Sequence, residues 1–175
     1  MMFDISKSVG CTERMNYLKR GFLFYMCSSC MLLVQFAIYL VNSNYWESLN
    51  FVGGFYYLMA ALGQAFLFNL IPWVILYIPF TWWRQMQKVG TILFSCAIFL
   101  LNVLAYLNGI VFQLYKFHIN GFVLDLAFGG GGNQVFVFNN TLILHGVLIG
   151  LLILLFTLAV VFIAYRYAWY VTSKQ

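Results

Sequence analysis

Four long stretches of the sequence contain no Asp, Glu, Lys or Arg. They are residues 21–41, 52–80, 89–112 and 141–165. An α-helix needs about 20 mostly apolar residues to cross the roughly 30 Å hydrocarbon core of a bilayer. Strands of a membrane β-barrel would alternate apolar and polar residues, and runs such as 148–161 do not alternate. The pattern therefore predicts an all-α membrane protein with four transmembrane helices.

The segments between these stretches refine the prediction. The connection 81–88 is short, so the second and third helices should pack as an antiparallel hairpin. Pro72 should kink the second helix and Pro79 should end it, because proline lacks a backbone N–H. The connection 113–140 is long, and within it Asn120 suits a helix N-cap and Gly129 a helix end. We expect a short interfacial helix there, with its rings toward the membrane.

The basic residues predict the orientation. Lys and Arg bias their side of a membrane protein toward the cytoplasm. Of the nine Lys and Arg residues, only Lys116 falls on one side of the four predicted helices; the other side holds Lys7, Arg14, Lys19, Arg20, Arg84, Lys88, Arg166 and Lys174. We therefore expect the N-terminal segment 1–20 and the tail 166–175 to be cytoplasmic, and the loop 113–140 to be external.

The composition excludes a water-soluble domain. Only 7% of the residues are charged, 64% are hydrophobic, and the mean hydropathy is +0.90. Soluble proteins carry roughly 25% charged residues. The net charge of +5 is explained by membrane orientation, so we expect no nucleic-acid partner. No motif indicates a cofactor.

Amide side chains are the main polar groups inside the predicted helices. In hydrocarbon such groups usually bond other helices, so we expect interhelical polar contacts from Gln64, Asn69, Asn102 and Asn108. An alternative is a small transporter or channel, with a polar path along Asn69, Asn102, Asn108 and Gln113. Ion-coupled carriers place ionisable residues in their spans, and no acidic residue, Lys or Arg lies in these four.

The external segment after the third helix mixes polar and aromatic residues. It supplies the candidates for lipid or partner contact: Tyr115, Lys116, Phe117, His118, Asn120 and Asp125. A second alternative is a lipid-modifying membrane enzyme that uses His118, Asp125 and His145. Cys27 and Cys30 have CxxC spacing but lie within an uncharged helix, where thiols act as small apolar residues. We therefore expect no disulfide and no metal site. With no catalytic constellation evident, we expect no enzyme.

Residues 108–126 carry the most specific pattern in the chain. The pair Val111 and Phe112 precedes Tyr115 and Phe117, then His118 and Asn120, and then the apolar run 123–126. This pattern resembles the membrane domain of the inner-membrane, sulfatase-like lipopolysaccharide regulators, the YejM/PbgA type of Gram-negative bacteria. Residues 63–67 and 78–80 also fit the second helix of that family. The similarity extends from about Tyr17 to Tyr170.

The resemblance implies a location and partners. Members of that family have five membrane helices followed by a periplasmic domain shaped like an alkaline-phosphatase-type hydrolase. Because four helices are present here, we expect a short relative without the fifth helix and the hydrolase domain. The resemblance implies a non-enzymatic protein of the bacterial inner membrane. Its implied contacts are phospholipid or lipopolysaccharide in the periplasmic leaflet and a tetratricopeptide adaptor protein.

Overall fold

A computed structural model of the protein describes residues 2–42, 50–116, 118–121, 125, 129 and 140–172. Within these residues the long elements are all helices: α1 (Met2–Asn42), α2 (Phe51–Pro72), α3 (Gln87–Tyr115) and α6 (Asn140–Thr172). The described helices include four spans long and apolar enough to cross a membrane, namely Glu13–Val41, Phe51–Thr81, Gln87–Tyr115 and Ile143–Arg166. The predicted all-α architecture with four membrane-length helices is confirmed.

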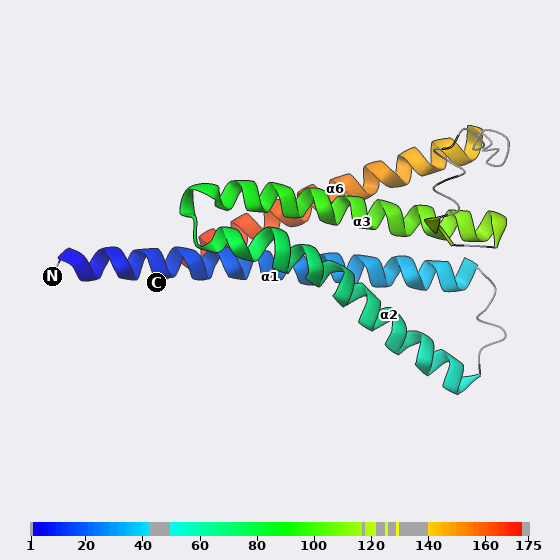
Figure 1. The fold of residues 1–175 in the computed structure, drawn as a ribbon, viewed down its shortest axis with the longest axis horizontal. Coiled ribbons are helices and arrows are strands. Elements are labelled where there is room, and N and C mark those ends of the chain that lie inside the picture. The colour runs from blue at the N-terminus through cyan, green and yellow to red at the C-terminus, as the bar shows by residue number, and fades with distance from the viewer. Residues whose placement is uncertain are drawn as a thin grey trace.

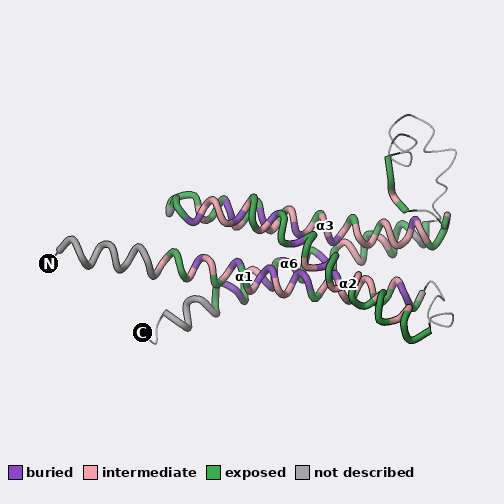
Figure 2. The backbone as a smooth tube through the Cα atoms, turned by 60° about the horizontal axis from the view of Figure 1, so that its bottom comes forward, coloured by how far each residue is buried: buried purple, intermediate pink, exposed green. Residues whose placement is uncertain are grey.

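The helices form an elongated bundle with both chain ends at the same end (Figure 1). The α2–α3 connection lies at that end too, and the other two connections lie at the opposite end. α1 packs against α2, α3 and α6, and α3 also packs against α6. Buried and exposed residues follow one another at short intervals along each helix (Figure 2), so each helix turns one face inward and another outward.

The first helix begins earlier in the sequence than its predicted span. α1 begins at Met2, so residues 2–20 of the predicted N-terminal segment continue into the first span as one helix. Residues 2–20 contain no proline, so nothing stops the helix there. In the predicted interfacial helix, Gly121 and Asp125 have helical backbone, and the Gly129 N–H donates to the Asp125 carbonyl at 2.7 Å. Residues 122–124 and 126–128 lie outside the described residues.

The second span changes its helical form at Pro72. A π-helix follows over Trp73–Tyr77, in which the Ile78 N–H donates to the Trp73 carbonyl, and a 3₁₀ helix then covers Ile78–Thr81. Proline cannot donate its own backbone hydrogen bond, and a wider turn is one way to absorb the defect. The helix changes direction around this stretch (Figure 1). The π-turn also places Tyr77 inside the bundle, where it is 1% exposed.

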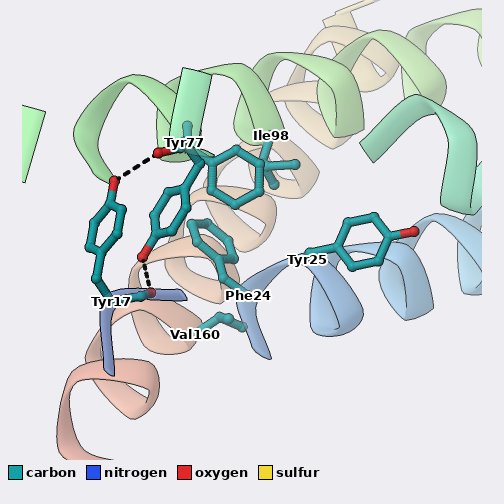
Figure 3. Close-up of a cluster of buried hydrophobic side chains, with 7 residues drawn as sticks. Tyr17, Phe24, Tyr25, Tyr77, Ile98 and Val160 are labelled. Atoms are coloured by element: carbon teal, nitrogen blue, oxygen red, sulfur yellow. Dashed lines mark hydrogen bonds between the residues drawn. The ribbon is translucent and has the colours of Figure 1, made fainter. Parts of the chain in front are cut away.

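Tyr77 and Tyr17 form the centre of the core near the chain termini (Figure 3). Their rings stack at 4.1 Å with an interplanar angle of 3°. The Tyr77 hydroxyl donates to the Tyr17 carbonyl at 2.7 Å, and the Tyr17 hydroxyl donates to the Tyr77 carbonyl at 3.3 Å. Moving a hydroxyl from water to an alkane, where it has no hydrogen-bond partner, costs about 4–8 kcal/mol. The reciprocal pair avoids that cost and joins α1 to the π-helix.

Aromatic and aliphatic side chains extend this core to the remaining helices. Phe94 of α3 packs edge-on against Phe24 of α1 at 5.1 Å and against Tyr77 at 5.3 Å. Ile98 of α3 and Val160 of α6 complete the cluster (Figure 3). Many large apolar side chains point outward instead, as expected for a surface in contact with lipid rather than water.

Glycine at position 21 is required by this packing. A Cβ placed on Gly21 would overlap the ring of Tyr77, whereas a Cβ on Gly146 would meet nothing within 4 Å. We predict that Gly21→Ala lowers the free energy of unfolding by about 1–3 kcal/mol through overpacking. Gly146→Ala, the matched control in α6, should leave it unchanged or raise it by up to about 1 kcal/mol through helix propensity. Thermal unfolding of the purified chain in detergent measures both; equal stabilities would contradict the packing.

Candidate functional site

Polar side chains from three helices meet inside the membrane spans. The Ser28 hydroxyl of α1 donates to Asn69 Oδ1 of α2 at 3.0 Å, and Asn102 Nδ2 of α3 donates to Ser28 Oγ at 3.3 Å. Asn69 Nδ2 also donates to Ser29 Oγ at 3.3 Å. These four side chains are at most 1% exposed. Together with Gln35 of α1 they form what we call the amide network.

Further bonds extend this network, although Gln35 Oε1 is buried without a hydrogen-bond partner among the described residues. Asn69 Nδ2 donates to the Ala65 carbonyl at 3.0 Å, and Asn102 Nδ2 donates to the Ile98 carbonyl at 2.8 Å. Gln35 Nε2 donates to Asn102 Oδ1 at 3.2 Å. The amides therefore bond serines and helix backbone inside the bundle. Asn69 and Asn102, two of the residues predicted to make interhelical contacts, both form a hydrogen bond with Ser28 and do not line a channel.

The two serines were not predicted to be part of a site. They lie between Cys27 and Cys30, and the sequence interpretation there considered only the thiols. A signal was present in the sequence, because buried amides in the second and third helices need hydrogen-bond partners, and serine hydroxyls on the first helix can supply them. The structure places Cys30 and Cys96 on exposed faces and Cys27 half-buried, all three as free thiols.

A second group of side chains lies at the end of the bundle opposite the chain termini. Asn108 Oδ1 accepts the Ile119 N–H at 2.8 Å, so its NH₂ group faces Nδ1 of His118, 3.2 Å away. An NH₂ group only donates, so Nδ1 accepts and the neutral imidazole carries its proton on Nε2. Asn108, predicted to bond another helix, instead ties the chain after α3 back onto that helix.

Aromatic stacking supports the same arrangement. The His118 ring stacks on Phe112 at 4.6 Å with an interplanar angle of 22°, and Tyr39 of α1 packs edge-on against Phe112 at 5.3 Å. Lys116 ends α3 with φ 62°, and its ammonium lies 6.0 Å from the centre of the Phe112 ring. The left-handed residue reverses the chain, which brings His118 back over Phe112. We call Tyr39, Asn108, Phe112, Lys116 and His118 the loop-end cluster.

The remaining predicted residues are spread around these two groups. Tyr115 is half-buried in the last turn of α3, Asn120 and Asp125 are exposed, and Phe117 lies outside the described residues. Gln64 is exposed on α2, and its side chain forms no hydrogen bond with a described residue. The interhelical polar contact predicted for Gln64 is therefore not made among the described residues.

The three residues of the proposed enzyme alternative do not converge on a metal site. His118, Asp125 and His145 are all exposed. Across the part of the chain that the structure describes, no three His, Cys, Asp or Glu side chains come together as ligands.

Basic side chains gather at the end that holds the chain termini. Among them, the Arg20 Nε donates to the Asn16 carbonyl at 3.3 Å, and the Arg20 guanidinium lies 4.8 Å from the centre of the Tyr165 ring. Cation–π contacts of this kind join the first and last helices. Lys116 lies at the opposite end, so the two ends of the bundle differ in charge.

A family model described as "Domain of unknown function (DUF3413)" matches residues 12–174. The chain belongs to the DUF3413 family. No curated protein and no solved structure matches it. The match includes the amide network and the loop-end cluster, so both lie in the part of the chain that defines membership of DUF3413.

The two groups differ in what they can do chemically. The serines and asparagines of the DUF3413 amide network are buried and bonded to one another, which holds α1, α2 and α3 in register. The loop-end cluster leaves the Nε2–H of an exposed His118 and the ammonium of an exposed Lys116 beside aromatic rings. Both groups are hydrogen-bond donors, which suits an anionic oxygen next to an apolar surface.

Asn102 tests the amide network. Asn102→Leu removes the acceptor of Gln35 and a donor to Ser28, and leaves buried polar atoms unpaired. We predict that the free energy of unfolding falls by about 1–3 kcal/mol, measured by denaturant titration in detergent. Gln113→Leu, an exposed amide on the same helix, should change it by less than about 0.5 kcal/mol. Additive effects of Asn102→Leu and Ser28→Ala would show that the network is not cooperative.

Asn108 tests the loop-end cluster. Asn108→Leu removes the acceptor of the Ile119 N–H, so we predict that hydrogen exchange at this amide becomes faster by about 10-fold. Amide exchange followed by mass spectrometry or NMR measures the change, with Gln113→Leu as the control on the same helix. The ¹⁵N shifts of His118 should also report a neutral ring protonated at Nε2. Unchanged exchange at Ile119 would mean that Asn108 does not hold the loop.

Proposed function

We propose that this DUF3413 protein is a non-enzymatic, multi-pass protein of the bacterial inner membrane that acts through lipid and protein contacts. In this proposal it works as the membrane domain of a lipopolysaccharide-synthesis regulator. The observation that carries the proposal is the division of polar groups. Asn69 and Asn102 of the spans are buried and bonded within the amide network, while the donors of His118 and Lys116 are exposed at one end.

The loop-end cluster suits a phosphate-bearing lipid headgroup. Lys116 supplies a positive charge and His118 supplies the Nε2–H donor, both next to the Phe112 ring. Phosphate groups of phospholipid or lipopolysaccharide accept such donors, and acyl chains cover the aromatic surface. Phe112, His118 and Asn120 also belong to the motif that resembles the lipopolysaccharide regulators, which supports a lipid of the periplasmic leaflet.

The proposed topology and protein partner have separate support. Eight of the nine basic residues fall in the parts of the sequence that lie toward the end with both chain termini, which favours a cytoplasmic location of that end. Exposed apolar side chains cover the outer faces of the helices, as contact with lipid or with another membrane helix requires. The family resemblance favours a tetratricopeptide adaptor of the inner membrane as the partner.

The two alternative functions have less support. A transporter needs Asn69 and Asn102 to face a polar path, yet both are 0% exposed and bonded within the network. A lipid-modifying enzyme needs His118, Asp125 and His145 to converge, and these described residues form no metal-ligand group.

Lipid recovery tests the proposed function. We predict that the full chain purified from native bacterial membranes carries lipopolysaccharide, measured by mass spectrometry of bound lipid, and the tetratricopeptide adaptor. Lys116→Asn removes the charge but tolerates the left-handed backbone, so lipid recovery should fall by about 10-fold. His145→Ala, an exposed histidine on α6, is the matched control and should leave it unchanged. Recovery of neither lipopolysaccharide nor adaptor would rule the proposal out.

A further inference from the structure

α2 exposes an amide in the middle of its membrane span. The buried face of this helix includes Ala61, which is 8% exposed, and Ala65, which is 0% exposed. Gln64 lies beside them but on the exposed surface, and its side chain forms no hydrogen bond with any residue that the structure describes. α2 also diverges from α1 toward its Phe51 end (Figure 1), and its outer face carries exposed apolar side chains such as Leu67 and Ile71.

The depth of Gln64 makes this exposure costly. At 1.5 Å per residue, Gln64 lies about 20 Å along the helix from Phe51 and about 25 Å from Thr81. Both distances are too long for the short side chain to reach the headgroups from its place in the span. Lipid tails offer no hydrogen-bond partner, so an amide at this depth is satisfied only by another protein group. No residue that the structure describes supplies this group, so a second molecule is the source that the geometry favours.

The residues next to Gln64 form a surface suited to a second helix. Ala60, Gln64, Leu67, Ile71 and Val74 are spaced alternately by four and three residues, which is the repeat of a helix–helix seam. Leu67 is 58% exposed, Ile71 is 56% exposed, and a Cβ on Gly63, next to Gln64, would meet nothing within 4 Å. The small residues Ala60 and Gly63 lie in and beside this row, where they permit close approach of two backbones. We call the five residues Ala60, Gln64, Leu67, Ile71 and Val74 the α2 seam.

We propose that the α2 seam pairs with the α2 seam of a second copy of this chain, with the two Gln64 side chains hydrogen-bonded to each other. Two copies inserted in the same orientation place Gln64 at the same depth, and a twofold axis along the membrane normal brings the two together. An amide both donates and accepts, so it is complementary to its own copy. A lone carboxylate or ammonium at this position would need a different partner. The dimer does not depend on the proposed lipid and adaptor contacts.

Self-association in a bilayer tests this dimer. Full chains labelled with donor or acceptor fluorophores are reconstituted into phosphatidylethanolamine–phosphatidylglycerol vesicles, and energy transfer is followed as protein is diluted with lipid. We expect a density-dependent dimer whose dissociation constant rises about 10-fold in Gln64→Leu. Gln64→Asn should retain most of the affinity because it keeps the amide. Leu104→Ala, at an exposed position of α3, is the control and should leave the affinity unchanged.

Gly63→Leu provides a second test that is independent of hydrogen bonding. The space around Gly63 is open within one chain, so the bulky side chain should leave the fold intact and weaken only the dimer. Thermal unfolding in detergent checks that each variant is folded. A chain that stays monomeric at every density overturns the proposal, and so does a dimer that neither Gln64→Leu nor Gly63→Leu weakens. Pairing of α2 with a helix of another protein, while this chain alone stays monomeric, overturns it too.

Discussion

The absence of hydrogen-bond partners in hydrocarbon is the constraint on which this structure depends. Each polar group in a span must find its partner in protein. Helix formation gives the backbone N–H and C=O groups their hydrogen-bond partners, and the polar side chains need further partners. Tyr17 and Tyr77 donate to each other's backbone carbonyls, and Ser28 links Asn69 to Asn102. These solutions join different helices, so the same bonds that satisfy polar atoms also specify which helices are neighbours.

α1 is the helix that makes most of these connections. It supplies Tyr17 to the aromatic core, Ser28 and Ser29 to the amide network, and Tyr39 to the loop-end cluster. Contacts therefore follow α1 along its length, from the end with the chain termini to the opposite end. Lipid-exposed helices gain little from the hydrophobic effect on association. Close packing and polar bonds along one central helix are the interactions that remain to hold the bundle together.

The same constraint separates the functional possibilities. Polar groups that are fully bonded inside the bundle, as Asn69 and Asn102 are, stabilise the fold and have no capacity left for a ligand. Groups that are left over, such as the exposed ends of Lys116 and His118 and the amide of Gln64, are the ones available to lipids and other proteins. Polar atoms that the described residues do not satisfy are therefore the ones that mark the contact surfaces of this protein.

The sequence by itself determined the four spans, the all-helical class, the end of the second span near Pro79 and the asymmetry of basic residues. Span length depends on bilayer thickness, and the side on which Lys and Arg lie depends on membrane insertion, so both can be read from local composition. It also singled out Asn69, Asn102, Asn108 and His118, although not their partners Ser28, Ser29 and Tyr39. Only the tertiary structure decided that Ser28 bonds Asn69 and Asn102, that Asn108 bonds the loop, and that Gln64 faces outward. An amide inside an apolar run looks the same on either face of a helix, and its partner is set by rotation and neighbours that are distant in sequence.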